Sequence, residues 1–438
     1  MKKTIIILAM FLPICGFGQQ NWSLQSCISY ALEHNLQVKQ SELSLQSSEI
    51  SLKSAKNNFL PGISASFSDG FSFGRSQSRD GVYIDQNTNS GNAAIGADVN
   101  IFQGMRRHYE VKIRKNDLDA RFLDNEKIKN DLSLNIASLY LNVLIQKELL
   151  KISQEQASMT DSLVAKTKIL VNNGKQAMSK LYEINAQKAN DNYNIFTCEK
   201  NLQLALLDLA QMLELENTNG FDIEAPNFDE NIADNDVPTV IFDNVTNILP
   251  DVKVEKLRLE SSKLAVKQAN SGWYPTINLS ANTNTGFYYY LNSGNGTANT
   301  PFFDQIKSNW RSYVGVSVNI PIFDRLETKN NVKLNKIAIQ QQEIKIESAK
   351  KTLFKDIQKA VLNAKVSKER FQATQQSVDA NQEAYRYIEE QYNYGRSTIV
   401  DLQQSKNNLL KAQSEQIQAK YEFIFNTKVL KFYQQGKL

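Results

Sequence analysis

The residue types that build most catalytic and metal sites are scarce and scattered in this chain. Its 438 residues include two His, at positions 34 and 108, and three Cys, at positions 15, 27 and 198. Zinc sites and Cys–His nucleophiles need such residues close together, and a disulfide framework needs more cysteines. Isolated Asp and Glu pairs on predicted helices are typical of solvated surfaces. The sequence therefore predicts no catalytic group, no cofactor and no metal ion.

Two glycines lie where repeated turns are expected. Gly174-Lys175 and Gly395-Arg396 each follow a long helical pattern and precede a shorter one. Glycine at such a position caps a helix in the left-handed conformation, and its lack of a side chain allows close approach by a partner. The two roles are compatible, so the glycines are predicted to cap the helices, and a role in contact with a partner stays open at this stage.

Composition narrows the class of protein. Charged residues make up 22% of the chain and hydrophobic residues 41%, which excludes a disordered tail. Beyond the N-terminus no window holds about 18 consecutive apolar residues, so no transmembrane helix is predicted. The formal charge of +4 comes without a basic block, which argues against a nucleic-acid partner.

The N-terminus indicates export from the cytoplasm. Residues 1–18 contain two lysines, an apolar run and then small residues, as a secretory signal peptide does. Gly16 and Gly18 suit the positions before a cleavage site, which gives a mature chain from Gln19. A lipoprotein signal at Cys15 is the alternative, although bulky Ile14 stands where a small residue is preferred.

Two cysteines remain in the mature chain. Cys27 and Cys198 are far apart in sequence, and we expect both to be buried small residues rather than a disulfide.

The chain contains an internal duplication. Three matches occur in the same order and at nearly the same separation: residues 48–55 with 262–269, residues 96–101 with 315–320, and Gly174 with Gly395. Each match is weak alone, but together they span most of the chain and predict a duplicated unit rather than a short-period solenoid.

Each unit is predicted to contain two β-strands after a short helix. Helical patterns over residues 35–58 and 251–272 end near Pro61 and Pro275, after which apolar and polar residues alternate. Alternation is typical of a sheet over a soluble core, and equally of transmembrane strands with apolar residues toward lipid. The connections over residues 74–92 and 292–309 are rich in Gly, Asn, Ser and Thr, and we expect exposed loops.

The transmembrane interpretation makes specific assignments. Eight apolar residues at alternating positions are predicted to face lipid: Ile63, Phe67, Ile95, Val99, Ile277, Leu279, Val316 and Val318. Four strands cannot close a barrel, and open sheet edges are not tolerated in lipid, so several chains must share one barrel. Two chains would give a plugged barrel and three an open one.

Two long helices are predicted, over residues 105–172 and 326–393. Neither range contains proline, and each would be roughly 68 residues or ~100 Å long. A seven-residue apolar period indicates left-handed coiled-coil pairing. Its members are Ile136, Val143, Leu150, Ala157, Val164 and Val171, and then Ile357, Ala364, Phe371, Val378, Tyr385 and Tyr392. Shorter helices are expected to return over residues 178–215 and 398–434.

The predicted fold class is therefore mixed, with long coiled-coil helices that line an α-barrel and four transmembrane strands per chain. The first repeat covers residues 19–215, with strands at about 62–73 and 93–103. A connector follows over residues 216–248, with a short strand near 221–223 and acids that we expect to be solvated. The second repeat covers residues 249–438, with strands at about 276–290 and 310–322.

The sequence resembles the TolC-like outer-membrane factors, the outer membrane efflux protein family. The resemblance rests on Trp22-Ser23-Leu24 with Cys27-Ile28, Tyr30-Ala31-Leu32 and Asn35-Leu36, on Val171-Asn172-Asn173-Gly174, and on the run from Tyr392 to Leu402. It implies a homotrimer with a shared twelve-stranded barrel in outer-membrane lipid and a long periplasmic tunnel. Such a protein is not an enzyme but the exit duct of a tripartite efflux pump or type I secretion system.

The resemblance also assigns the partners and the docking residues. A periplasmic adaptor (membrane fusion) protein and an inner-membrane transporter would complete the assembly. The adaptor would pack on the hairpin tips, at Gly174 and Lys175 of the first repeat and at Gly395, Arg396 and Ser397 of the second.

The resemblance further implies a gate just beyond the second tip. Asp401 stands where the family places an acidic ring at the periplasmic constriction, and Gln404 stands where a second acid is often found. A ring of three aspartates would concentrate cations and raise the pKa of each carboxyl.

The contacts that hold the family's closed state are only partly present. Tyr392 matches a tyrosine of that lock, but Ser397 replaces the expected arginine, and Arg396 lies one position early. Lys180 replaces the acidic partner in the first repeat. The replacement for this lock cannot be named from the sequence.

One alternative class remains at this stage. A secreted coiled-coil scaffold or adhesion protein with a soluble β head would share the export signal, the helices and the alternating strands. A heat-modifiable trimer in membrane extracts would separate the two classes.

Overall fold

The computed structural model describes residues 22–77, 81–85, 87–218, 220–225, 237–291 and 299–436. The predicted signal peptide, with Cys15 and the start at Gln19, lies outside these residues. Contacts group the described chain into two compact units. Of the described residues, the first unit comprises those up to Leu43, those within Asp124–Asp251 and those from Lys350 onward, and the second comprises those within Ser44–Leu123 and Val252–Ala349. Among the described residues, no helix is both long and apolar enough to cross a membrane.

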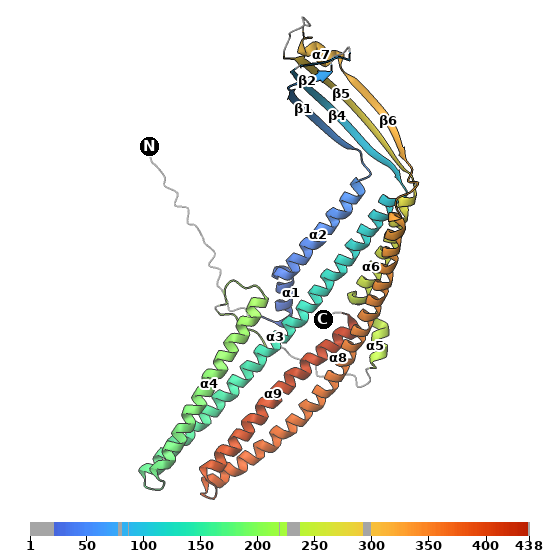
Figure 1. Ribbon diagram of the computed structural model, residues 1–438. Helices are drawn as coiled ribbons and strands as arrows, with labels where there is room; N and C mark the ends of the chain where they lie inside the picture. Colours follow the sequence, from blue (N-terminus) through green and yellow to red (C-terminus); the bar gives the residue numbers. More distant parts are fainter. Residues whose placement is uncertain are drawn as a thin grey trace, which may run out of the picture. The chain divides into compact units, whose positions relative to one another are not determined.

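The same order of elements occurs twice along the chain (Figure 1). The first series is α1 (Leu24–His34), α2 (Leu36–Asn57), β1 (Gly62–Ser72), β4 (Thr88–Gln103), α3 (Arg106–Asn172) and α4 (Met178–Met212). The second series is α5 (Pro238–Val245), α6 (Pro250–Asn270), β5 (Thr276–Tyr290), β6 (Arg311–Asn319), α8 (Glu327–Asn393) and α9 (Ile399–Gln435). The short helices α1 and α5 were not predicted.

The strand boundaries differ from the predictions at two places. β4 begins at Thr88 and not near residue 93, because the polar stretch before Ala93 pairs its backbone with both β1 and β5. β6 ends at Asn319 and not near residue 322, because Pro321 has no N–H to donate to a ladder.

The two connections predicted as loops contain regular structure. A small hairpin of β2 (Arg75–Gln77) and β3 (Tyr83–Asp85) follows β1, and helix α7 (Phe302–Ser308) lies between β5 and β6. The side-chain amide of Gln305 on α7 bonds both backbone groups of Tyr288, where β5 extends beyond β6. These elements form through contacts with β5 and with each other, which local composition does not reveal.

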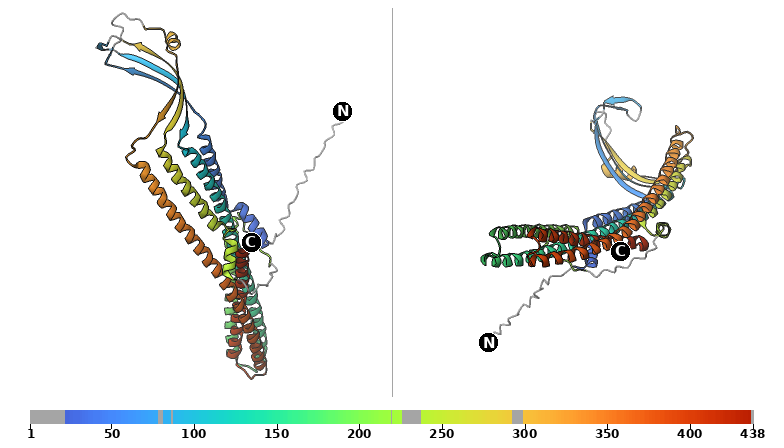
Figure 2. Two further views of the ribbon diagram at one scale, coloured as in Figure 1. Left: turned by 90° about the vertical axis from the view of Figure 1, so that its right-hand side faces the viewer. Right: turned by 90° about the horizontal axis from the view of Figure 1, so that it is seen from below.

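The second unit carries an antiparallel four-stranded sheet in the order β1-β4-β5-β6. The sheet is curled along its width, as Figure 2 shows in the view from below. Directly paired residues of antiparallel strands project from the same face. Ile63 pairs with Ala97, Ala97 with Ala281, and Ala281 with Val314, so these four side chains form one row.

The register gives the sheet one apolar and one polar face. All eight residues predicted to face lipid belong to the face of Ile63: Ile63, Phe67, Ile95, Val99, Ile277, Leu279, Val316 and Val318. The opposite face carries mostly serine and asparagine, as in the row formed by Ser66, Ala94 and Asn284. The apolar face is open in the single chain, since Ile63 is 75% exposed.

The long helices form as predicted. α3 and α8 have 67 residues each and begin one residue later than expected. The heptad residues Ile136, Val143 and Ile357 are fully buried and Ala364 nearly so. These residues show that the seven-residue period marks the packed side of each helix in the first unit.

Each long helix begins with the same unusual turn. Gly104 and Met105 before α3 have φ of 58° and 65°, and Arg325 and Leu326 before α8 have φ of 55° and 65°. The left-handed conformation costs an L-residue roughly 1–2 kcal/mol. The second repeat therefore holds two strained non-glycine residues where the first holds one.

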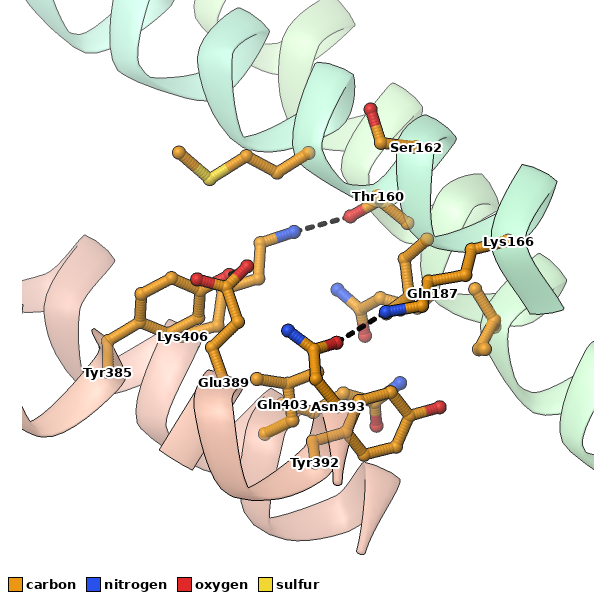
Figure 3. Close-up of a pocket in the computed structure, with 14 residues that line it drawn as sticks. Thr160, Ser162, Lys166, Gln187, Tyr385, Glu389, Tyr392, Asn393, Gln403 and Lys406 are labelled. Carbon is orange, nitrogen blue, oxygen red and sulfur yellow. Dashed lines mark hydrogen bonds between the residues drawn. The ribbon is translucent and has the colours of Figure 1, made fainter. Parts of the chain in front are cut away.

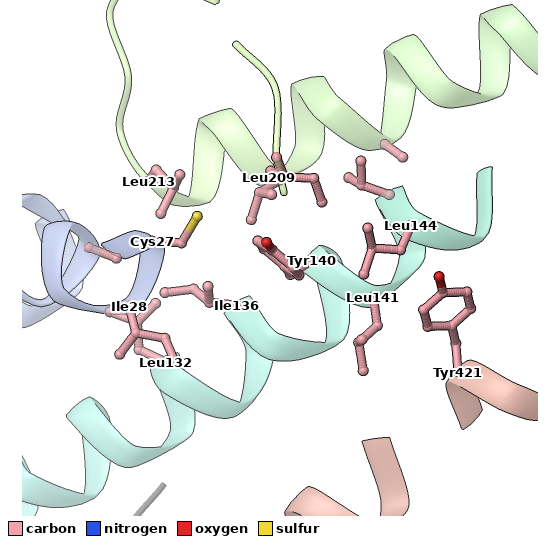
Figure 4. Close-up of a cluster of buried hydrophobic side chains, with 14 of the residues drawn as sticks. Cys27, Ile28, Leu132, Ile136, Tyr140, Leu141, Leu144, Leu209, Leu213 and Tyr421 are labelled. Atoms are coloured by element: carbon pink, nitrogen blue, oxygen red, sulfur yellow. The ribbon is translucent and has the colours of Figure 1, made fainter. Parts of the chain in front are cut away.

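A core cluster in the first unit joins α1 to α3 and α4 (Figure 4). Cys27, Tyr140 and Leu209 are fully buried there. The Tyr140 hydroxyl donates to the backbone oxygens of Trp22, at 3.0 Å, and Glu224, at 2.6 Å. Burial raises the pKa of the Cys27 thiol to about 12, so this cysteine is an inert core residue.

Other expectations for this region are only partly met. Cys198 is half-buried rather than buried, and both cysteines are free. The strand predicted near residues 221–223 is reduced to one parallel bridge between Ile223 and Trp22. Asp222 of the connector is not only solvated, because it forms an ion pair with Lys147 at 2.5 Å.

Candidate functional site

The first hairpin tip, between α3 and α4, is closed by a glycine cap. Gly174 has φ of 69° and donates its N–H to the Val171 oxygen at 2.9 Å, while Lys175 donates to Leu170 at 2.8 Å. These two bonds form a Schellman motif, which satisfies carbonyl groups at the helix end.

The second tip, between α8 and α9, repeats this geometry. Gly395 has φ of 70° and bonds the Tyr392 oxygen at 3.0 Å, while Arg396 bonds Gln391 at 2.9 Å. No atom lies within 4 Å of the position that a Cβ would take at Gly174 or Gly395. The predicted caps are confirmed, and both tips leave open space beside the glycine.

Asp401 has a structural role that sequence reasoning missed. It is the third residue of α9 and forms a capping box with Thr398, whose N–H and hydroxyl donate to the carboxylate at 3.0 and 2.6 Å. Ser397 adds a third bond at 3.3 Å. The hydrogen bonds from Thr398 lower the pKa of Asp401 below its ordinary value. The spacing Thr-x-x-Asp was the signal for this motif.

The remaining predicted gate residues are not brought together in the single chain. Lys180 pairs at 2.9 Å with Glu183 on its own helix. Gln404 donates to Asn408, also on its own helix, at 3.0 Å. Arg396 is exposed at the tip.

Tyr392 alone among these residues packs between the hairpins. It lies against an apolar cluster that contains Ile184 of α4, Tyr385 of α8 and Ile399 of α9. The ring is half-buried there. Of the predicted gate residues, it is the one placed to influence how the two hairpins fit together.

A buried charged cluster, missed from the sequence, joins the two hairpins. The Lys406 ammonium of α9 donates to the Asp191 carboxylate of α4 at 2.9 Å, to the Gln156 backbone oxygen at 3.0 Å and to the Thr160 hydroxyl. Thr160 donates to the same Asp191 oxygen, and Gln187 donates to the other at 2.7 Å. The Lys406 and Asp191 side chains are only 10% and 8% exposed.

A second link between the hairpins is exposed. The Lys166 ammonium of α3 donates to the Asn393 side-chain oxygen of α8 at 2.5 Å. Both residues face solvent. Lys406 and Lys166 thus join the same pair of hairpins, the first as a buried cation and the second as an exposed one.

A cavity of about 180 Å³ adjoins the buried cluster (Figure 3). Lys406, Thr160 and Gln187 contribute to its lining, together with Tyr385 and Tyr392. Among the described residues, no group of His, Cys, Asp and Glu side chains could hold a metal ion. The buried cluster and the cavity together form a polar contact between α9 of the second hairpin and α3 and α4 of the first.

The chain matches a family model over most of its length. Residues 27–214 and 247–426 match the family described as outer membrane efflux protein. Outer membrane protein TolC of Escherichia coli K12 is 24% identical, over 97% of this chain and 85% of that protein. A second relative, the probable efflux pump outer membrane protein TtgC of Pseudomonas putida KT2440, is 24% identical over 41% of this chain and 34% of its own.

Solved structures share the fold. The outer membrane protein VceC of Vibrio cholerae superposes with a TM-score of 0.76 at 15% identity, over 94% of this chain and 96% of that chain. The CmeC outer membrane channel of Campylobacter jejuni gives 0.76 at 16% identity, over 94% and 86%.

The family match defines a channel-tunnel protein rather than an enzyme, and the fold, with its two helical hairpins and one-sided sheet, agrees with that class. Such channels are trimeric and work with adaptor proteins and inner-membrane pumps. The chain belongs to the outer membrane efflux protein family. It is located in the outer membrane, extends into the periplasm and forms the exit duct of an efflux pump.

Proposed function

We propose that three copies of this chain close one twelve-stranded barrel, with the apolar face of the sheet toward lipid. The supporting observation is the sheet itself. One face is apolar in every strand, and the outer strands β1 and β6 each have one neighbour among the described residues. Pairing β6 of one copy with β1 of the next removes both open edges, as lipid requires.

The test is the assembly of the full-length protein in outer membranes. Mild detergent extraction should give a trimer that migrates as one band without heating and as a monomer near 50 kDa after boiling. A monomer that remains soluble without detergent would contradict the proposed barrel and favour a secreted scaffold.

The proposed duct is built from the two sequence repeats, residues 19–215 and 249–438, with the connector over 216–248 between them. The matching ends of α3 and α8 support this division, since both helices have 67 residues and both end in a Schellman motif. Each trimer would then present six similar hairpin tips.

The tips at Gly174 and Lys175 and at Gly395, Arg396 and Ser397 are proposed to dock the adaptor. The open space beside both glycines supports close approach of a partner helix. Adaptor cross-linking to cysteines placed at Lys175 and Arg396 should be strong in the wild-type background and weak when Gly395 is changed to Val. Unchanged cross-linking in that variant would exclude the tip as a docking site.

The periplasmic gate is proposed to include a ring of three Asp401 side chains, one from each copy. Asp401 is exposed in the single chain, so its carboxylate is available to passing ions while Thr398 holds it in place. A charged ring in a narrow pore selects cations. Single-channel recording of Asp401→Ala should show reduced cation selectivity and reduced block by multivalent cations. Wild-type selectivity and block in this variant would remove Asp401 from the gate.

A further inference from the structure

The buried cluster around Lys406 spans two separate helical hairpins. Lys406 belongs to α9, whereas its acceptors belong to α3 and α4 of the other hairpin. Any motion that separates α9 from α3 and α4 must break all three hydrogen bonds of this ammonium. Contacts within one hairpin, such as the Lys180–Glu183 pair, would survive that motion.

Burial gives this contact an all-or-none character. Lys406 and Asp191 are both about nine-tenths buried, so neither charge is well hydrated while the hairpins are packed. A buried charge that loses its partner without gaining water is strongly destabilised. Small separations of the hairpins are therefore unfavourable, and only a motion large enough to admit water becomes favourable.

The cavity of about 180 Å³ provides the place where water can enter. Its lining includes Lys406, Thr160 and Gln187, which are three of the polar groups in the cluster. Its other walls include Tyr385 and Tyr392 of the second hairpin, so its volume would grow as the hairpins part. Hydration of the ion pair is thereby coupled to hairpin separation.

We propose that the cluster of Lys406, Asp191 and Thr160 is a latch that holds the two hairpins of each chain together and is released by hydration when the tunnel opens. The inference rests on the proposed function, in which the hairpin ends close the periplasmic end of the tunnel. It names the contacts that stand in for the partly absent lock, which the sequence could not supply.

The Lys166–Asn393 contact provides a matched control. It joins the same two hairpins through a lysine ammonium, but both of its residues are exposed. Exposed polar contacts between long side chains contribute little, because water replaces them readily. Lys166→Met removes the same functional group as Lys406→Met, but from an exposed contact with the neutral Asn393 amide at the rim of the same cavity, where no carboxylate is left unpaired.

The first experiment measures open probability of purified trimers in planar bilayers. Lys406→Met leaves Asp191 buried without its cation, and we expect open probability to rise by at least about tenfold. The double variant Lys406→Met with Asp191→Leu removes both charges and should return to within about threefold of wild type, because an apolar pair needs no hydration. Lys166→Met should remain at the wild-type level.

A second pair of variants keeps the test decisive if Lys406→Met fails to assemble. Thr160→Val preserves side-chain volume and removes the hydroxyl shared by Lys406 and Asp191, so open probability should rise several-fold. Thr167→Val is its control, since Thr167 is buried on α3 seven residues further along. In the double-variant background, which lacks both charges, Thr160→Val should have no effect beyond that of Thr167→Val.

Two results would overturn the latch. One is a Lys406→Met or Thr160→Val channel with wild-type open probability. The other is a charge-free double variant that stays as open as the single variant. A wild-type chain that forms no conducting trimer would overturn the proposed function and the latch with it, whereas the two results above overturn the latch alone.

Discussion

Replacing Val316 by Arg tests the lipid-facing assignment most directly. Val316 lies next to the centre of β6, pairs with Leu279 of β5, and is 61% exposed on the apolar face. An arginine on the lipid face near the membrane midplane costs about 2–4 kcal/mol. Three copies per trimer would raise the cost to about 6–12 kcal/mol, which is comparable to the whole stability of a typical domain.

The neighbouring residue supplies the control. Ser317 pairs with Asn278 and projects from the opposite, polar face of the same strand. Ser317→Arg introduces the same side chain one residue away, toward the proposed lumen, where it remains hydrated. Any loss common to both variants would reflect strand disruption and not lipid exposure.

The assay compares outer-membrane fractions for heat-modifiable trimer. Val316→Arg should reduce the trimer band severely, whereas Ser317→Arg should keep it near the wild-type level. Equal assembly of both variants, or a greater loss for Ser317→Arg, would refute the assignment of the apolar face to lipid.

Three further predictions concern the turns. Because the folded-state pKa of Asp401 lies below its ordinary value of 3.8, its capping contribution is complete above that pH and is lost as pH falls through the folded value. Hydrogen-exchange protection at the start of α9, taken relative to the intrinsic exchange rate at each pH, should therefore fall below pH 3.8. Thr398→Ala, expected to cost about 0.5–2 kcal/mol, should abolish that pH dependence. Gly395→Val forces a β-branched residue to a φ of 70° and should abolish efflux in a drug-susceptibility assay while trimers persist; normal efflux would contradict the docking role. Arg325→Gly removes the backbone strain of an arginine in the left-handed conformation and should raise the free energy of unfolding by about 0.5–1 kcal/mol. Gly104→Arg introduces the same strain at the matching turn of the first repeat and should lower the free energy of unfolding. Denaturant titration measures both changes.

The features predicted from the sequence are those with a regular local signal. Alternation placed all eight residues that were predicted to face lipid on one face of the sheet. The seven-residue period placed Ile136 and Ile357 in the packed interior. Glycine after each long helix predicted both caps. The two periodic patterns have the same period as the strand or helix that they describe, and glycine suits the left-handed cap, so that each signal is local in the sequence.

The features that the sequence did not reveal depend on contacts between distant segments. The first residues of β4 have no apolar alternation, and their strand is set by backbone pairing with β1 and β5. Helix α7 is fixed against β5 through Gln305. The tip motif predicts a gate residue at Asp401, whereas the structure shows its side chain bonded to Thr398, for which the Thr-x-x-Asp spacing is the local signal.

The charged latch shows most clearly what only the tertiary structure decides. In sequence, Lys406 is one of six consecutive polar residues between Leu402 and Leu409. Nothing in the sequence distinguishes it from the many exposed lysines of this chain. Its burial depends on Asp191 and Thr160, which lie far from it in sequence and approach it only when the hairpins pack. Periodicity can specify which face of a helix is buried, because the chain geometry of one helix sets that face. The alignment of α9 with α4 decides which charges meet between the two hairpins. That alignment is set by the packing of the whole unit.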